Sequence, residues 1–404
     1  MYICNETAYF HIIKLMKAYI ERAISSTVKE AYKYFPVITI TGPRQSGKTT
    51  LIKHMFDEVP YVSLENLDVL NFALNDPVAF LGEHDKGMIL DEVQNAPGLL
   101  SYIQGIVDEN SDKKFILSGS SNFSLLKSVT QSLAGRTAIF ELLPFSYSEI
   151  KLLAENKPKS LDNLLFDGFY PSVYAEKNIP SFLYPNYVRT YLERDVRDLL
   201  QVKNLVQFQT FLRLCAGRLG SLFNASELSN EVGVAVNTIK SWLSVLQTSY
   251  IVFLLPPYFE NCNKRLTKTP KLYFTDTGLA CYLLGIETPE QLARDKMKGL
   301  IFENFVIVEA LKNRYNSGKE SNLFFYRDSH QNEVDLLLKE GNSFRAFEIK
   351  SAQTYNTGFE KGLKYFDSLF GERVVDKTII YTGEFENTSG NINLLNYRNV
   401  FNGH

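Results

Sequence analysis

The spacing of apolar residues predicts an α/β core in the first third of the chain. Between about residue 37 and residue 144, short apolar runs alternate with stretches of helical pattern. This alternation is typical of a parallel sheet whose strands are covered by helices on both faces. The five expected strands lie at 37–40, 60–64, 87–91, 114–118 and 137–141.

The region from 206 to 290 predicts a winged helix. A helix beginning at Ser226 is broken by Gly233, and Asn237 is expected to open a second helix as its N-cap. Two strand-like runs then predict a ribbon with a basic wing. They lie at 250–255 and 271–275, on either side of the segment 263–268.

The last part of the chain has a different order of patterns and predicts a separate α/β domain. A long helical pattern is followed by three strand patterns, a second helix and two further strands. The order of this core is α-β-β-β-α-β. The expected helices lie at 297–315 and 358–369, and the expected strands at 323–327, 333–338, 344–349, 378–381 and 392–395.

These patterns divide the chain into five segments. Because no low-complexity linker separates them, we expect the segments to pack against one another. The sequence leaves open whether translation begins at Met1 or at Met16. The segments are an N-terminal helical segment (1–33), the α/β core (34–145), a helical lid (146–205), the winged helix (206–290) and the C-terminal α/β domain (291–404).

Composition and charge narrow the class of protein. The 404 residues carry a formal net charge of −2 at pH 7, so a surface that attracts nucleic acid must be local. The four cysteines, Cys4, Cys215, Cys262 and Cys281, form no CxxC pair and indicate reduced thiols rather than a zinc site. No apolar run approaches the ~18 residues of a membrane-spanning helix, and the N-terminus has no clear signal peptide. We expect a cytoplasmic protein without a membrane partner.

The stretch after the first expected strand matches GxxxxGK[ST], the pattern of loops that bind phosphate groups. Backbone N–H groups and the positive end of the next helix converge there, and Gly42 and Gly47 let the backbone close around an anion. Lys48 would reach the β- and γ-phosphates, and the Thr49 hydroxyl would ligate Mg²⁺. The alternative is a glycine turn that matches by chance. We expect ATP and Mg²⁺ to bind through Gly42, Pro43, Arg44, Gln45, Ser46, Gly47, Lys48, Thr49, Thr50 and Asp91.

An acidic pair ends the third expected strand. If this strand lies beside the first, Asp91 holds the Mg²⁺ shell and Glu92 can orient the attacking water. The alternative is a solvated strand end. The fourth expected strand ends in polar residues, where a γ-phosphate sensor is expected; Ser120 is our choice, with Ser118 as the alternative.

Phosphoryl transfer also needs positive charge beside the γ-phosphate. Arg136, just before the fifth expected strand, is the candidate, acting within the chain or on a neighbouring subunit of a homo-oligomer. Arg44 and Arg194 are weaker candidates. The alternative for each is a surface or salt-bridged arginine.

The C-terminal domain contains a second candidate site. Asp335 and Glu348 lie on two strands joined by a turn, so they can face each other, and Lys350 shares the strand face of Glu348. Two carboxylates can share a divalent cation, and the lysine can position or activate a water. Glu303 lies on an apolar helix face, where a buried carboxylate needs a partner. These four residues predict a nuclease-like site with Asp335 and Glu348 as metal ligands.

Several motifs together resemble a family of bacterial and archaeal AAA-type ATPases whose C-terminal half is a domain of unknown function. The resemblance covers nearly the whole chain beyond about residue 16. It implies an AAA-type fold with ATP binding, a winged helix, and a C-terminal domain similar to PD-(D/E)xK restriction endonucleases. The motifs are TGPRQSGKTT (41–50), ILDEVQ (89–94), LAGR (133–136), LPF (143–145), GFYP (168–171), YLERDV (191–196), FTDTGL (274–279), GLIFE (299–303) and EVD (333–335).

Two functions fit these features. The first is an ATPase that uses its nucleotide state to control DNA binding and metal-dependent DNA cleavage. The second is a nucleotide-driven switch whose C-terminal domain only binds nucleic acid or protein. The second helix of the winged helix carries one cation, Lys240, and a winged helix used only for packing is a further alternative. The other contacts with DNA phosphates would come from Lys264, Arg265, Lys268 and Lys271.

Overall fold

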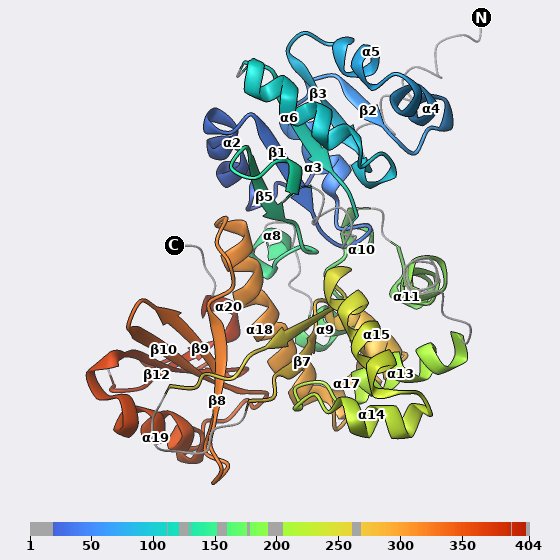
Figure 1. Ribbon diagram of the computed structural model, residues 1–404. Coiled ribbons are helices and arrows are strands. Elements are labelled where there is room, and N and C mark those ends of the chain that lie inside the picture. Colours follow the sequence, from blue (N-terminus) through green and yellow to red (C-terminus); the bar gives the residue numbers. More distant parts are fainter. Residues whose placement is uncertain are drawn as a thin grey trace, which may run out of the picture.

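The computed structural model describes residues 19–400 except 111, 121–128, 130, 152–159, 176–177, 193–204, 261–267 and 389. Met16, Arg194, Lys264 and Arg265 lie outside the described residues. Figure 1 shows two sheets at opposite ends of the molecule, with helix α18 (Lys298–Asn316) between them. None of the helices in the described ranges has the length and hydropathy needed to span a membrane.

The first sheet has five parallel strands, as the sequence predicts. They are β1 (Val37–Thr41), β2 (Tyr61–Ser63), β3 (Gly87–Asp91), β4 (Lys114–Ser118) and β5 (Thr137–Glu141). The order across the sheet is β2-β3-β4-β1-β5. The condition that β3 lies beside β1 is therefore wrong, because β4 is inserted between them and pairs with both.

Helices cover both faces of this sheet because successive residues of each strand point to opposite sides. Ile38 and Ile40 pack with α2 and α3, whereas Met88 and Leu90 pack with the helices on the other face. The helices are α2 (Ser25–Tyr34), α3 (Lys48–Met55), α4 (Leu67–Asn75), α5 (Pro77–Gly82) and α6 (Leu99–Glu109).

Short helices connect this sheet to the rest of the molecule. Their apolar residues join one continuous core with α18 and with the two-stranded ribbon of β6 (Val252–Leu255) and β7 (Lys271–Phe274), so the segments pack together. They are α8 (Tyr147–Lys151), α9 (Leu161–Asp167), α10 (Pro171–Ala175) and α11 (Pro180–Tyr187), followed by a π-helical turn at Val188–Leu192.

Three helices and a two-stranded antiparallel ribbon follow. Gly233 ends α14 with φ of +75°, a left-handed conformation that favours glycine. Helix α15 begins at Val236 after Ala235, so Asn237 lies inside the first turn and is not the N-cap. The elements are α13 (Leu205–Gly217), α14 (Ala225–Val232), α15 (Val236–Thr248), β6 (Val252–Leu255) and β7 (Lys271–Phe274), followed by α16 (Thr277–Leu283) and α17 (Pro289–Arg294).

The C-terminal domain has a second five-stranded sheet of order β12-β11-β10-β9-β8. Strand β9 is antiparallel to β8 and β10, whereas β10, β11 and β12 are parallel. The element order agrees with the predicted one. The elements are α18 (Lys298–Asn316), β8 (Leu323–Arg327), β9 (Glu333–Glu340), β10 (Ser343–Lys350), a 3-10 turn (Thr357–Glu360), α19 (Lys361–Phe370), a 3-10 turn (Gly371–Arg373), β11 (Val374–Tyr381), β12 (Asn393–Asn396) and α20 (Tyr397–Val400).

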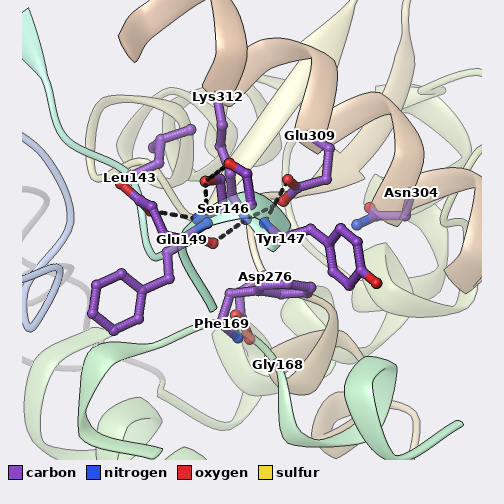
Figure 2. A network of polar contacts seen from close by, with 12 residues as sticks. Leu143, Ser146, Tyr147, Glu149, Gly168, Phe169, Asp276, Asn304, Glu309 and Lys312 are labelled. Carbon is purple, nitrogen blue, oxygen red and sulfur yellow. Dashed lines mark hydrogen bonds and ion pairs between the residues drawn. The ribbon is translucent and has the colours of Figure 1, made fainter. Parts of the chain in front are cut away.

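A buried polar network joins α18 to the loop that follows the first sheet (Figure 2). Lys312 Nζ lies 2.8 Å from Glu309 Oε1 and donates to the Phe145 carbonyl at 2.7 Å. The Tyr147 N–H donates to the other Glu309 oxygen at 2.7 Å. Burial raises the pKa of Glu309, and the Lys312 ammonium opposes that rise.

Replacing Lys312 by methionine tests this network. The change would leave Glu309 buried without its cation, and removing one partner of a buried pair costs about 3–5 kcal/mol of folding free energy. Lys33→Met is a matched control, because Lys33 pairs with Glu30 at the same i, i+3 spacing on an exposed surface. We expect urea unfolding to show a clear loss for Lys312→Met alone, and equal stability of the two variants would contradict the buried pair.

Candidate functional site

The phosphate-binding pattern forms a loop between β1 and α3. Gly42 has φ of +149°, and a Cβ there would lie 2.2 Å from the Leu142 carbonyl oxygen. Gly47, with φ of +93°, directly precedes the first residue of α3. The amino end of α3 therefore faces the loop, as anion binding requires.

Lys48 lies buried at the start of α3. Its Nζ donates to the carbonyl oxygens of Gly42 (3.0 Å) and Pro43 (2.9 Å), so the ammonium points back into the loop. Burial lowers the pKa of Lys48 to about 8, against the opposite pull of the Glu92 and Asp91 carboxylates. A phosphate group would replace the two carbonyls as a stronger partner for this cation.

The Asp91 carboxylate is almost fully buried and receives several donors. Thr49 Oγ1 and the Tyr61 hydroxyl each donate to Oδ2 at 2.7 Å, and Ser118 bonds Oδ1. Thr49 and Asp91, which the sequence predicts as the two protein ligands of Mg²⁺, are therefore in direct contact, although β4 separates β1 from β3. Burial and the bond to Asp91 raise the pKa of Tyr61. Sequence reasoning missed Tyr61 because no motif includes it.

Glu92 has a left-handed backbone, with φ of +54°. Its Oε2 accepts from the Ser120 N–H at 3.3 Å and from the Ser120 hydroxyl at 3.4 Å, and Gln94 also bonds it. Ser118 is bonded to Asp91 instead. The candidate base and the preferred sensor therefore contact each other.

Arg136 does not reach this site within its own chain. It precedes β5 at the end where Val37 pairs with Thr137, whereas the loop follows the other end of β1. Five residues at about 3.3 Å each separate the two ends. The Arg136 guanidinium forms a two-point ion pair with Asp108 on the surface, at 2.6 and 2.7 Å. A role within the chain is therefore wrong, and a role in a neighbouring subunit stays a prediction.

Arg22 supports the loop from the N-terminal segment, and sequence reasoning did not identify it. Its guanidinium donates to the Ser46 carbonyl at 2.8 Å and to the Leu143 carbonyl at 2.7 Å. It also pairs with Glu149 at 3.0 Å, and both side chains are buried. Arg22 thus fixes one peptide of the loop to the chain that leaves the sheet.

The candidate residues of the C-terminal site come together at one end of the β9–β10 hairpin. The pairing of Leu336 with Phe347 brings Asp335 and Glu348 next to each other. Lys350 Nζ lies 2.7 Å from Glu348 and 3.3 Å from Asp335. Burial and the Asp335 charge raise the pKa of Glu348 to about 8, and Lys350 opposes the rise.

Glu303 has partners from β7 rather than from β9 and β10. Its Oε1 accepts from the Tyr273 hydroxyl at 2.6 Å and lies 3.3 Å from Lys271 Nζ. Lys271 also pairs with Glu333 at 2.5 Å. The expected phosphate contact by Lys271 is wrong, because this lysine is buried and neutralises two carboxylates.

Three family models match the chain. The model described as AAA domain matches residues 34–151. Domain of unknown function (DUF8612) matches 158–290, and Domain of unknown function (DUF4143) matches 298–400. The first match and the loop geometry together support the class of P-loop ATPases of the AAA type.

Relatives resemble the chain over most of its length. An uncharacterized protein of Mycobacterium tuberculosis is 28% identical over 366 residues, which cover 90% of this chain and 80% of the relative. An uncharacterized protein of Methanocaldococcus jannaschii is 23% identical, covering 74% of this chain and 71% of the relative. Among solved structures, a Walker-type ATPase of Pyrococcus abyssi has a TM-score of 0.45 at 16% identity, covering 66% of this chain and 96% of that chain.

Proposed function

We propose that the protein hydrolyses ATP and couples its nucleotide state to DNA binding and metal-dependent DNA cleavage. The observation that carries the ATPase part is the contact of Thr49 with Asp91 at 2.7 Å, beside the buried Lys48 at the start of α3. A hydroxyl and a carboxylate are the oxygen ligands that Mg²⁺ prefers. The residues present therefore fit a bound Mg²⁺–nucleotide.

Each residue in and beside the loop has its own role in the proposed reaction. Mg²⁺, held by Thr49 and Asp91, would neutralise charge on the β- and γ-phosphates. Lys48 binds these phosphates, and Glu92 orients the attacking water. Ser120 senses the γ-phosphate and, through its two contacts with Glu92, links that sensing to the base.

Buried contacts supply a path from the loop to the C-terminal domain. Arg22 bonds Ser46 in the loop and Glu149 beyond β5, and Glu149 also accepts from the Ser146 N–H. The adjoining residues 145 and 147 contact Lys312 and Glu309 on α18. A change at the loop can therefore reach α18 through packed, paired groups.

We propose that α13–α15 and the β6–β7 ribbon act as a winged helix that binds DNA. The outward positions of α15 are polar and suit base or phosphate contacts. Among the described residues of 205–274, the exposed cations are Arg213 on α13, Lys240 on α15 and Lys268 just before β7. The exposed residues of α15 are Asn237, Lys240, Ser241, Ser244 and Gln247.

In the C-terminal domain, the adjacent carboxylates of Asp335 and Glu348 could bind a divalent cation together. Glu348 Oε2 is buried and has no hydrogen-bond partner among the described residues, so it is available as a ligand with Asp335. A cation held there would stabilise charge on a phosphodiester, and Lys350 would position the attacking water.

The second candidate function, a switch that binds without cutting, is favoured by a specific observation. The described residues contain no group of three or more His, Cys, Asp or Glu arranged to hold a metal. Glu303, the expected third acid, is held by Lys271 and Tyr273 instead.

The Lys48→Ala variant tests the ATPase proposal. Loss of the cation at the transferred phosphate should lower ATP turnover by about 10²-fold or more. Lys29→Ala, an exposed change on α2, is the control and should leave turnover unchanged. Phosphate release with Mg²⁺ measures both, and equal turnover of Lys48→Ala and wild type would reject the assignment.

A cleavage assay separates the two functions. Linear, single-stranded and branched DNA are incubated with wild type, Lys350→Ala and the control Lys364→Ala in Mg²⁺ or Mn²⁺. We expect products with wild type and Lys364→Ala, and none with Lys350→Ala. If wild type and Lys350→Ala are equally inert, cleavage is rejected and the binding switch remains.

Salt titration tests DNA binding. Replacing Lys240 and Lys268 together by alanine should reduce the slope of log affinity against log salt by about 2, one for each lost phosphate contact. The double variant Lys29→Ala/Lys33→Ala removes the same charge from α2 as a control. A wild-type affinity with no salt slope would remove nucleic acid from the list of partners.

A role for Arg136 in a neighbouring subunit requires self-association. Sedimentation velocity with Mg²⁺ and ATP measures it, and a monomer that turns over ATP at all concentrations would exclude this role.

A further inference from the structure

Three hydroxyl groups from three different elements converge on the Asp91 carboxylate. Thr49 comes from α3, Ser118 from β4 and Tyr61 from β2. Thr49 belongs to the phosphate-binding pattern and Ser118 was an alternative for the sensor, but Tyr61 has no role in the chemistry described above. Its hydroxyl donates to Oδ2, the same oxygen that receives Thr49.

The position of Tyr61 is set from two sides. Strand β2 pairs in parallel with β3, with Tyr61 opposite Ile89 and Ser63 opposite Asp91. Lys53, on the helix that follows the loop, places its ammonium 3.6 Å from the centre of the Tyr61 ring. This cation–π contact ties the ring to the helix that also carries Thr49.

A hydrogen bond behind a metal-binding carboxylate fixes the direction of its oxygen atoms. Such outer partners typically change metal affinity or activity by 10–100-fold when they are removed. With Thr49 as a direct ligand, the second donor on Oδ2 determines how the Asp91 carboxylate faces the ion.

We propose that Tyr61 is a positioning residue that orients Asp91 toward the Mg²⁺ of the bound nucleotide. This inference rests on the proposed ATPase function. It assigns Tyr61 to metal binding rather than to nucleotide binding or to the chemical step. Removal of its hydroxyl should therefore raise the metal concentration that the protein needs and leave metal-free nucleotide affinity unchanged.

The Tyr61→Phe variant tests this assignment, because phenylalanine keeps the ring and its contact with Lys53. Mn²⁺ binding to the protein with saturating ADP is measured by electron paramagnetic resonance, and turnover is measured across a Mg²⁺ titration. We expect the dissociation constant for Mn²⁺ and the half-saturating Mg²⁺ to rise about 10-fold. Turnover at saturating Mg²⁺ and ADP affinity in EDTA should stay near wild type. Tyr102→Phe, at a tyrosine that is 45% exposed on α6, is the control.

The outcomes separate this inference from the ATPase proposal. Unchanged Mn²⁺ and Mg²⁺ dependence in Tyr61→Phe, beside a wild type that binds metal and nucleotide, overturns the inference alone. A wild type that binds no Mn²⁺ with nucleotide overturns both. A parallel loss of metal-free ADP affinity and of folding stability would show a merely structural tyrosine and also overturn the inference.

Discussion

Helix α18 is buried on nearly all sides, and this constraint organises the rest of the molecule. A buried polar side chain destabilises the fold unless it is hydrogen-bonded or paired. Asn304 exchanges two hydrogen bonds with the backbone of Phe274 on β7, and Lys312 bonds the Phe145 carbonyl beyond the first sheet. The polar residues of one helix thus specify how the first sheet, the ribbon and the C-terminal domain fit together.

The same constraint links the two candidate sites. Near one end, α18 carries Glu303, which Tyr273 and Lys271 hold beside the C-terminal acidic residues. Further along, Glu309 accepts a hydrogen bond from the Tyr147 N–H. Arg22 joins the neighbouring Glu149 to the phosphate-binding loop. These packed and paired groups are the route by which we propose that a change at the loop reaches α18.

Local pattern was enough to predict most elements but few of their long-range partners. The strand at 87–91 and the hairpin that carries Asp335 and Glu348 follow from apolar runs and turns, whereas the register that places these two residues next to each other comes from the structure. The order of strands does not, because the apolar pattern is the same whether β4 lies beside β1 or at an edge. Lys271 carries a charge and follows a basic segment, so its burial against Glu303 and Glu333 could be known only from the packing of two segments. Tyr61 lies on a strand with no functional motif, and its contact with Asp91 is a side-chain hydrogen bond between two strands that only the structure shows.

The central claim is that the nucleotide state and DNA binding are coupled within one molecule. Reciprocal binding measurements test it most directly, because coupling between two ligands must be equal in both directions. The affinity for DNA is measured with and without a non-hydrolysable ATP analogue and Mg²⁺, and the affinity for the analogue with and without DNA. The account predicts the same factor in both measurements, on the order of 5–150-fold. Affinities that do not depend on the second ligand would contradict it.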